Sequence, residues 1–321
     1  MKTVLITGGA GFVGSHLCDR LIKDNNIICL DNLYTGSMEN ISHLIGNPRF
    51  RFIKADITND LQFDGIDEIY NLACPASPVH YQSDPIGTTL TCTVGVNNIL
   101  RLATRLNAKV LQASTSEVYG NPLVYPQKED YFGNVNSCGV RSCYDEGKRC
   151  AESIFFDYHR KYGTDIKVVR IFNTFGERMA VNDGRVISNF IVQALKGEDI
   201  TIYGDGEQTR SFQYVSDLID GLVLMMNSKE TGAINIGTHH EFTINQIADI
   251  IKRETGSKSR IVHLPAMSDD PVVRRPDITK AEKLLGWSPK VSFEDGLMRT
   301  IGYFKEKTAP EKERPTNDFS E

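Results

Sequence analysis

The 321-residue sequence has little of what several classes of protein are built from. It contains one tryptophan, and no run approaches the roughly 18 consecutive apolar residues that a membrane-spanning helix requires. Lys and Arg number 36 against 41 Asp and Glu, so the net charge is −5 and no positive excess is available to hold a nucleic-acid backbone. We therefore expect no membrane span and no nucleic-acid partner.

Cysteine and metal-ligand patterns are equally sparse. No two cysteines stand in a Cys-x-x-Cys pair, their number is odd, and the adjacent His239 and His240 lack a companion ligand motif. Residues 1–7 have the pattern of a buried strand rather than the charged leader of a signal peptide. We expect a cytoplasmic protein with no metal site and no disulfide framework. The seven cysteines are Cys18, Cys29, Cys74, Cys92, Cys138, Cys143 and Cys150.

The sequence does contain a regular alternation of short β-rich runs and longer helical patterns. This alternation predicts βαβ units and an α/β fold with a Rossmann-type, doubly wound parallel sheet, in which ligands bind at the carboxyl ends of the strands. The predicted strands are residues 4–7, 27–31, 50–56, 68–73, 110–114 and 166–172, and the predicted helices between them are residues 12–23, 85–106 and 144–162.

A glycine motif follows the first predicted strand. Gly8, Gly11 and Gly14 would let the backbone turn tightly and approach a pyrophosphate at the start of a helix. The second strand ends about 20 residues later at Asp31, whose carboxylate can bind ribose hydroxyls and would repel a 2′-phosphate. The sequence therefore predicts NAD rather than NADP. Asp56, at the end of the third strand, is predicted either to bind the adenine amino group or to cap a following helix.

After residue 172 the pattern changes to helices separated by loops rich in Gly, Asp and Pro. We predict helices at residues 186–196, 217–226, 244–254, 279–285 and 293–304. We expect residues 1–180 to form mainly the NAD-binding domain and residues 181–304 mainly a smaller α/β substrate-binding cap, with some segments interleaved into the first domain. The polar residues 305–321 are predicted to be a disordered tail.

Five polar residues are candidates for catalysis. Tyr144 and Lys148 are four residues apart, on one face of a predicted helix. The lysine ammonium and the positive nicotinamide ring would favour the phenolate, although the pKa of a tyrosine is ordinarily about 10. Such a pair could remove a proton from a sugar hydroxyl while hydride leaves the same carbon. Thr115, Ser116 and Glu117 follow the fifth strand, where they could bind the reacting sugar and move its protons.

Arginines occur in two loops of the predicted cap. Arg210 lies in the stretch 203–210, and Arg274 in the stretch 269–277. Because a guanidinium group can hold a phosphate or a carboxylate with two hydrogen bonds, these loops favour an anionic sugar nucleotide as the ligand.

These motifs resemble those of the extended short-chain dehydrogenase/reductases, which combine Gly-x-x-Gly-x-x-Gly with Tyr-x-x-x-Lys. Longer stretches resemble the UDP-glucuronate decarboxylases (UDP-xylose synthases) within that family: residues 71–78, 113–120, 143–149, 171–176, 182–185, 208–215 and 269–277. The resemblance implies an NAD-dependent lyase that oxidises UDP-glucuronate at C4, releases carbon dioxide from the β-keto acid and reduces C4 again to give UDP-xylose. It also implies a homodimer that packs through the helices at residues 85–106 and 144–162.

The resemblance further implies a role for individual residues. Tyr144, helped by Lys148 and Thr115, would be the base at C4, and Ser116, Glu117 and Arg274 would act in decarboxylation and in reprotonation at C5. The implied NAD-binding residues are Gly8, Gly11, Phe12, Val13, Gly14, Asp31, Asn32, Thr35, Gly36, Asp56, Ile57, Leu72, Cys74, Thr91, Ala113, Tyr144 and Lys148. The implied substrate-binding residues are Tyr81, Asn173, Arg185, Tyr203, Arg210 and Arg274.

Related activities share most of these residues. A UDP-sugar 4-epimerase or a nucleotide-sugar 4,6-dehydratase would also carry the glycines, Asp31, Tyr144 and Lys148. The dehydratases usually have Asp-Glu where this chain has Ser116-Glu117, and the epimerases typically lack the acid, so the sequence favours decarboxylation. A decarboxylase that releases the UDP-4-keto-pentose remains an alternative, as does a non-catalytic NAD-sensing regulator.

Overall fold

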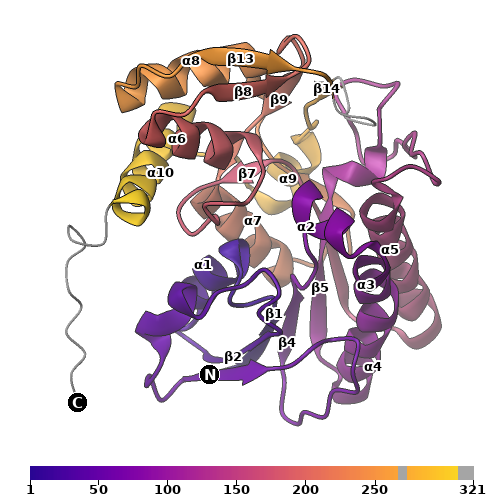
Figure 1. Ribbon diagram of the computed structural model, residues 1–321. Coiled ribbons are helices and arrows are strands. Elements are labelled where there is room, and N and C mark those ends of the chain that lie inside the picture. The colour runs from indigo at the N-terminus through magenta and orange to yellow at the C-terminus, as the bar shows by residue number, and fades with distance from the viewer. Residues whose placement is uncertain (267–272, 310–321) are drawn as a thin grey trace.

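The computed structural model describes residues 1–266 and 273–309, and its centre is a seven-stranded parallel sheet (Figure 1). The strand order is β11-β6-β5-β4-β1-β2-β3, so the order reverses beside β1 and creates the crevice in which doubly wound sheets bind ligands. The six predicted strands are confirmed. The strands are β1 (Thr3–Thr7), β2 (Asn26–Asp31), β3 (Phe50–Lys54), β4 (Glu68–Asn71), β5 (Lys109–Thr115), β6 (Ile166–Ile171) and β11 (Ile234–Ile236).

Helices cover both faces of this sheet (Figure 1). The helices are α1 (Phe12–Leu21), α2 (Pro78–Ser83), α3 (Pro85–Leu90), α4 (Val96–Leu106), α5 (Ser142–Tyr162), α6 (Val186–Lys196), α7 (Val215–Asn227), α8 (Ile244–Thr255), α9 (Thr279–Leu285) and α10 (Phe293–Thr308). Shorter turns of helix are η1 (Met38–Leu44), η2 (Thr91–Gly95) and η3 (Ser116–Tyr119). None of the helices in the described part of the chain is both long and apolar enough to cross a membrane.

The core lies on both sides of the sheet because successive strand residues point to opposite faces. Val4 and Ile6 of β1 belong to the cluster that includes residues of α1 and α7, whereas Leu5 belongs to the cluster that includes residues of α4 and α5. Val4, Leu5 and Ile6 are all completely buried between these two apolar clusters, which explains why no polar residue occurs among them.

Short strands beside the main sheet carry two of the arginines of interest. These strands are β7 (Thr174–Phe175), β8 (Ile200–Tyr203), β9 (Thr209–Ser211), β10 (Gln213–Tyr214), β12 (Glu241–Thr243), β13 (Ile261–Leu264) and β14 (Val273–Arg274). In particular, β14 pairs with β9 so that Arg274 lies next to Arg210. This pairing brings together two arginines that are 64 residues apart in the sequence.

Two predictions about elements were wrong in detail. The predicted helix 85–106 consists of α3, the wider π-helical turn η2 and α4. Thr91 and Thr93 within η2 hydrogen-bond to carbonyl oxygens one turn earlier, a side-chain interaction that competes with regular helix geometry. Residues 305–308, predicted to be disordered, continue α10, because Phe304 is fully buried and Thr308 donates a hydrogen bond to its carbonyl oxygen. Residues 310–321 lie outside the described chain.

Candidate active site

The glycine motif forms a tight turn between β1 and α1. Gly8 has a φ of +68°, in the left-handed region that glycine adopts at little cost. A Cβ atom at Gly14 would lie 2.0 Å from the carbonyl oxygen of Gly8, so any side chain there would force the helix away from the turn. No side chain caps the start of α1 at Gly11. The tight turn and the uncapped helix start therefore leave backbone N–H groups available to hydrogen-bond to an anion.

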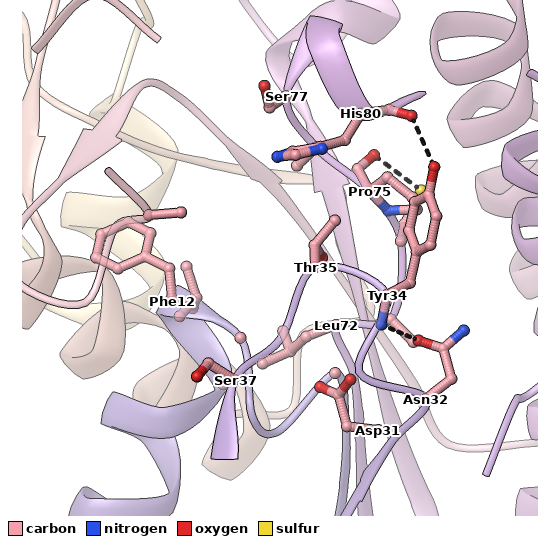
Figure 2. Close-up of a pocket in the computed structure, with 18 of the residues that line it drawn as sticks. Phe12, Asp31, Asn32, Tyr34, Thr35, Ser37, Leu72, Pro75, Ser77 and His80 are labelled. Atoms are coloured by element: carbon pink, nitrogen blue, oxygen red, sulfur yellow. Dashed lines mark hydrogen bonds between the residues drawn. The ribbon is translucent and has the colours of Figure 1, made fainter. Parts of the chain in front are cut away.

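A cavity of about 640 Å³ opens at this turn, at the carboxyl ends of the sheet strands (Figure 2). Its size is within the range of small-molecule and cofactor sites. Figure 2 shows Asp31, which ends β2, Asn32 and Thr35, which follow it, and Leu72, which follows β4, among the residues that line the cavity. The predicted cofactor residues that line it are Gly8, Gly11, Phe12, Val13, Gly14, Asp31, Asn32, Thr35, Asp56, Ile57, Leu72, Cys74 and Thr91.

The two predicted acidic cofactor residues make well-defined hydrogen bonds. One oxygen of Asp31 accepts from the N–H of Ala10 at 3.0 Å and the other from the N–H of Leu33 at 2.8 Å. Asp56 accepts from Thr58 and, at 2.7 Å, from the side chain of Asn32. No helix lies between Asp56 and β4 in the described chain, so the prediction that Asp56 caps a helix was wrong, and it closes a turn instead.

The remaining predicted cofactor residues, Gly36, Ala113, Tyr144 and Lys148, are not among those that line the cavity. A Cβ atom at Gly36 would lie 2.8 Å from both carboxylate oxygens of Asp31, so only a glycine lets this loop close over that side chain. The ammonium group of Lys148 donates to the carbonyl oxygen of Ala113 at 2.8 Å. This bond fixes the position of Lys148 relative to the end of β5.

Tyr144 is almost completely buried at the start of α5. Its ring stacks on that of Tyr81, with centroids 5.0 Å apart and planes within 6° of parallel, and the Lys148 ammonium lies 5.7 Å from its centroid. Burial makes the largest contribution to raising the pKa of Tyr144, and the electrostatic interaction with Cys74 makes the next largest. A hydrogen bond with Thr115 opposes this effect. The protein's own groups thus raise the pKa of the phenol above its usual range. That Lys148 and a bound nicotinamide together favour the phenolate stays a prediction.

Glu117 is held between two arginines in a buried cluster beside Tyr144. Its two carboxylate oxygens lie 2.8 Å from Arg141 and 2.6 Å from Arg274. Burial raises the pKa of Glu117, but Arg274, Arg141 and Arg210 lower it by a larger amount, so the group is a carboxylate. The N–H of Glu117 also donates to the hydroxyl of Thr115 at 3.2 Å, and the adjacent Ser116 is buried at the start of the same turn, η3.

The structure adds two residues that the sequence interpretation did not single out. Arg141 immediately precedes α5, and Asp145 follows Tyr144 within it. Burial and the charge of Glu117 raise the pKa of Asp145 to about 7. Its Oδ1 atom is buried and has no hydrogen-bond partner in the described part of the chain. Asp145 lies within a stretch that resembles the decarboxylases, but its importance follows from its electrostatic interaction with Glu117, which the sequence pattern does not show.

The predicted substrate residues fall into two groups. Tyr81, Arg210 and Arg274 lie with Glu117 and Tyr144. Asn173 is nearby, and its side chain donates to the carbonyl oxygen of Ser211 beside Arg210.

The other two substrate residues, Arg185 and Tyr203, lie on other elements. Arg185 lines the cavity, paired at 2.7 Å with Asp183 and stacked 5.8 Å from the centroid of Phe12, and it also acts electrostatically on Tyr144. Tyr203 ends β8 with 40% of its surface exposed. The structure therefore connects Arg185 with Tyr144, whereas Tyr203 lies at the end of a separate short strand.

Comparison with known proteins identifies relatives across nearly the whole chain. Residues 5–300 match the family model described as GDP-mannose 4,6 dehydratase. UDP-glucuronic acid decarboxylase 1 of Danio rerio is 54% identical over 94% of this chain and 72% of its own length. UDP-glucuronic acid decarboxylase 5 of Arabidopsis thaliana is 52% identical over 92% of this chain and 86% of its own length.

Solved structures with the same fold carry related ligands. UDP-glucuronic acid 4-epimerase from Bacillus cereus, in complex with UDP-glucuronic acid and NAD, has a TM-score of 0.85 and 30% identity, covering 95% of this chain and 99% of the epimerase. A dTDP-glucose 4,6-dehydratase from Streptomyces venezuelae with NAD bound has a TM-score of 0.88 and 28% identity, covering 95% of this chain and 97% of the dehydratase.

Proposed function

This chain belongs to the UDP-glucuronic acid decarboxylase family, and we propose that it converts UDP-glucuronate into UDP-xylose and carbon dioxide. The observation that carries the proposal is the carboxylate of Glu117 held by Arg141 and Arg274 beside Tyr144. An epimerase needs only the hydride-transfer half of this site, whereas loss of a carboxylate also needs positive charge to stabilise the electrons left behind.

The cofactor is NAD, and the cavity fits it. The close contact of Gly14 with Gly8 provides room for a pyrophosphate at the start of α1, and Asp31 presents its carboxylate where a ribose would lie. When bound, NAD accepts hydride from C4 of the sugar and returns it to the 4-ketone, and its positive nicotinamide ring favours a tyrosinate in the site.

Tyr144 acts as the base at the C4 hydroxyl. The stack with Tyr81 fixes the plane of its ring, and the hydrogen bond with Thr115 favours the phenolate. Lys148, anchored on the carbonyl oxygen of Ala113, holds a positive charge beneath the same ring. These contacts hold the phenol oxygen in one position for both the removal of the proton and its later return.

Decarboxylation follows from the chemistry of the 4-ketone. A ketone at C4 makes the C5 carboxylate that of a β-keto acid, so carbon dioxide can leave while the electrons are accepted as an enolate. Arg274 and Arg141 supply the positive charge that stabilises this enolate, and Glu117 holds the two guanidinium groups in place. Ser116, which is buried next to Glu117 in the sequence, and Asp145, with a pKa of about 7, are groups that can deliver a proton to C5.

The organisation of the whole molecule is part of the same proposal. We propose that residues 1–180 form mainly the NAD-binding domain, that residues 181–304 form mainly the substrate-binding cap, and that two chains pack as a homodimer. Strand β11 joins the main sheet from within the second region, which supports an interleaved arrangement. A decarboxylase that stops at the UDP-4-keto-pentose is the second candidate, since its site would need the same residues.

The reaction can be tested directly. With UDP-glucuronate and a catalytic amount of NAD, we expect carbon dioxide and UDP-xylose, identified by mass spectrometry. Formation of UDP-galacturonate, or recovery of unchanged UDP-glucuronate, would refute the proposal. Absorbance of NADH distinguishes the second candidate, because it rises in proportion to product only if the final reduction does not occur.

The role of Tyr144 is tested by Tyr144→Phe. We expect this variant to bind NAD normally and to lose at least about 10²-fold in the rate of single-turnover NAD reduction, because general-base catalysis contributes 10²–10⁴-fold. Tyr162→Phe is the matched control, since Tyr162 ends the same helix and is 54% exposed. If Tyr144→Phe reduces NAD at the rate of the unmodified chain, Tyr144 is not the base.

A further inference from the structure

Two cysteines face each other at the wall of the cofactor cavity. Cys74 follows β4 and lines the cavity, whereas Cys92 lies in η2 and is 2% exposed. Their Sγ atoms are 3.4 Å apart. Since a disulfide bond is about 2.05 Å long, the sulfurs need to approach by only about 1.4 Å to become bonded.

We propose that Cys74 and Cys92 form a reversible disulfide when the protein meets hydrogen peroxide, and that this bond switches off the adjacent site. The cavity gives peroxide a path to Cys74, while burial protects Cys92 from direct attack. Both thiols lie beside the proposed catalytic residues Lys148 and Tyr144. The expected loss of decarboxylation rests on the proposed function, whereas formation of the disulfide does not.

The chemistry assigns different roles to the two thiols. The hydrogen bond with Cys92 lowers the pKa of Cys74, and the positive charge of Lys148 acts in the same direction against the effect of burial. The thiolate of Cys74 attacks one peroxide oxygen and forms a sulfenic acid, releasing hydroxide. The thiol of Cys92 then attacks the sulfur of Cys74, forming the disulfide and releasing water. The two sulfurs lose two electrons in total, and peroxide gains both.

The bond would affect catalysis because Cys92 packs against α5. A Cβ atom at Gly147 would lie 3.0 Å from the Cβ of Cys92 and 3.3 Å from its Sγ, so the helix touches this cysteine between Tyr144 and Lys148. Drawing Cys92 toward Cys74 therefore removes the support beneath the two catalytic residues. At the same time the bond would displace Cys74, which lines the cavity.

The bond is tested with the full-length protein and hydrogen peroxide, with and without NAD. Peptide mapping by mass spectrometry should find one cross-link, between the peptides of Cys74 and Cys92, which dithiothreitol removes and bound NAD suppresses. Cys92→Ser and Cys92→Ala should both abolish it, whereas Cys150→Ser, which removes an exposed thiol from α5, should leave it unchanged. A cross-link to Cys143 instead, or separate oxidation of Cys74 and Cys92, would overturn the proposal.

The switch is tested by calorimetric titration with NAD and by decarboxylation. We expect cross-linked protein to bind NAD or to turn over about tenfold less well, because displacements of about 1 Å at a site have effects of this size or larger, and dithiothreitol should restore it. Cross-linked protein with unchanged NAD affinity and activity would overturn the switch. Peptide mapping and NAD titration need no substrate, so failure of the decarboxylation proposal would be recognised separately.

Discussion

At the scale of single residues, Asp145 and Glu117 are two interacting carboxyl groups whose pKa values are shifted in opposite directions. The arginines lower the pKa of Glu117, and burial together with the Glu117 charge raises that of Asp145 to about 7. Like charges this close do not both ionise readily. At neutral pH, Glu117 therefore carries the charge and Asp145 carries much of the proton.

This division predicts a pH-dependent stability. The folded protein keeps a proton on Asp145 up to about pH 7, whereas the unfolded chain releases it near pH 4. Between these pH values the folded form therefore binds more protons than the unfolded form. The free energy of unfolding accordingly falls as pH rises from 4 to about 7. Asp145→Asn cannot ionise and should be more stable than the unmodified chain at pH 8, by at most about 4 kcal/mol at 1.4 kcal/mol per pKa unit. Urea unfolding at pH 5, 6, 7 and 8 measures the difference.

A matched control separates this effect from the general loss of a carboxylate on α5. Asp157→Asn removes an exposed carboxyl group that pairs with Arg160 on the same helix, and its effect should be small and nearly constant over this range. If Asp145→Asn and Asp157→Asn show the same pH dependence, Asp145 does not titrate as inferred.

Single residues also show where prediction from sequence ends. Glycines, Asp31 and the Tyr144–Lys148 pair are recognisable because their spacing is local and set by one turn or one helix. Arg141 and Asp145 gain their importance from Glu117, which lies on a different element. The contact of Cys74 with Cys92 likewise joins the end of a strand to a helical turn. Such contacts depend on tertiary packing, which no local pattern encodes.

At the scale of elements, the same reason explains which strands were predicted. Within the main sheet, the six predicted strands carry four or more residues of β-rich pattern each, whereas the seventh, β11, has only three and pairs with β6 although more than 60 residues separate the two strands in the sequence. The π-helical turn η2 could not be predicted from the sequence either, because the apolar spacing of residues 85–106 fits a continuous helix. Length and periodicity identify elements, whereas the pairing of a short strand depends on the finished sheet.

Helix α7 holds the connection between α9 and α10 through Asp217, and this contact can be tested. The Asp217 carboxylate accepts hydrogen bonds from the N–H groups of Lys290 and Val291, each at 3.0 Å, and its carbonyl oxygen accepts from the indole of Trp287 at 2.9 Å. Asp217→Ala leaves two N–H groups without an acceptor and should lower the free energy of unfolding by about 2 kcal/mol. Fluorescence of Trp287, the only tryptophan, reports unfolding in urea.

Two further variants make this test specific. Asp217→Asn keeps an acceptor oxygen and should lose less than half as much stability as Asp217→Ala. Asp220→Ala, on the same helix, removes a side chain that is 42% exposed and contacts Arg20 at only 4.0 Å, so its effect should be below about 0.5 kcal/mol. Equal unfolding midpoints for Asp217→Ala and Asp220→Ala would contradict the proposed stabilising role of the Asp217 hydrogen bonds.

At the scale of the whole molecule, an apolar stripe lies on the surface of α3 and η2. Ile86, Leu90 and Val94 are spaced four residues apart and are 73%, 45% and 43% exposed. Residues at this spacing share one face of a helix, and an exposed apolar face of this kind is typical of a protein interface. Since α3 packs against α5 (Figure 1), the stripe lies beside the helices through which we propose that the homodimer forms.

The proposed dimer predicts a clear response to charge. At micromolar concentration, sedimentation equilibrium should give twice the mass of the chain. The double substitution Ile86→Asp and Val94→Asp should give the mass of one chain, because a dimer would bury two carboxylates per subunit without partners. Circular dichroism should show that this variant keeps its fold. Leu284→Asp alters a leucine on α9 that is 45% exposed, close to the 43% of Val94, and should leave the dimer intact. A monomeric unmodified chain, or a dimer that tolerates both aspartates, would place the interface elsewhere or exclude it.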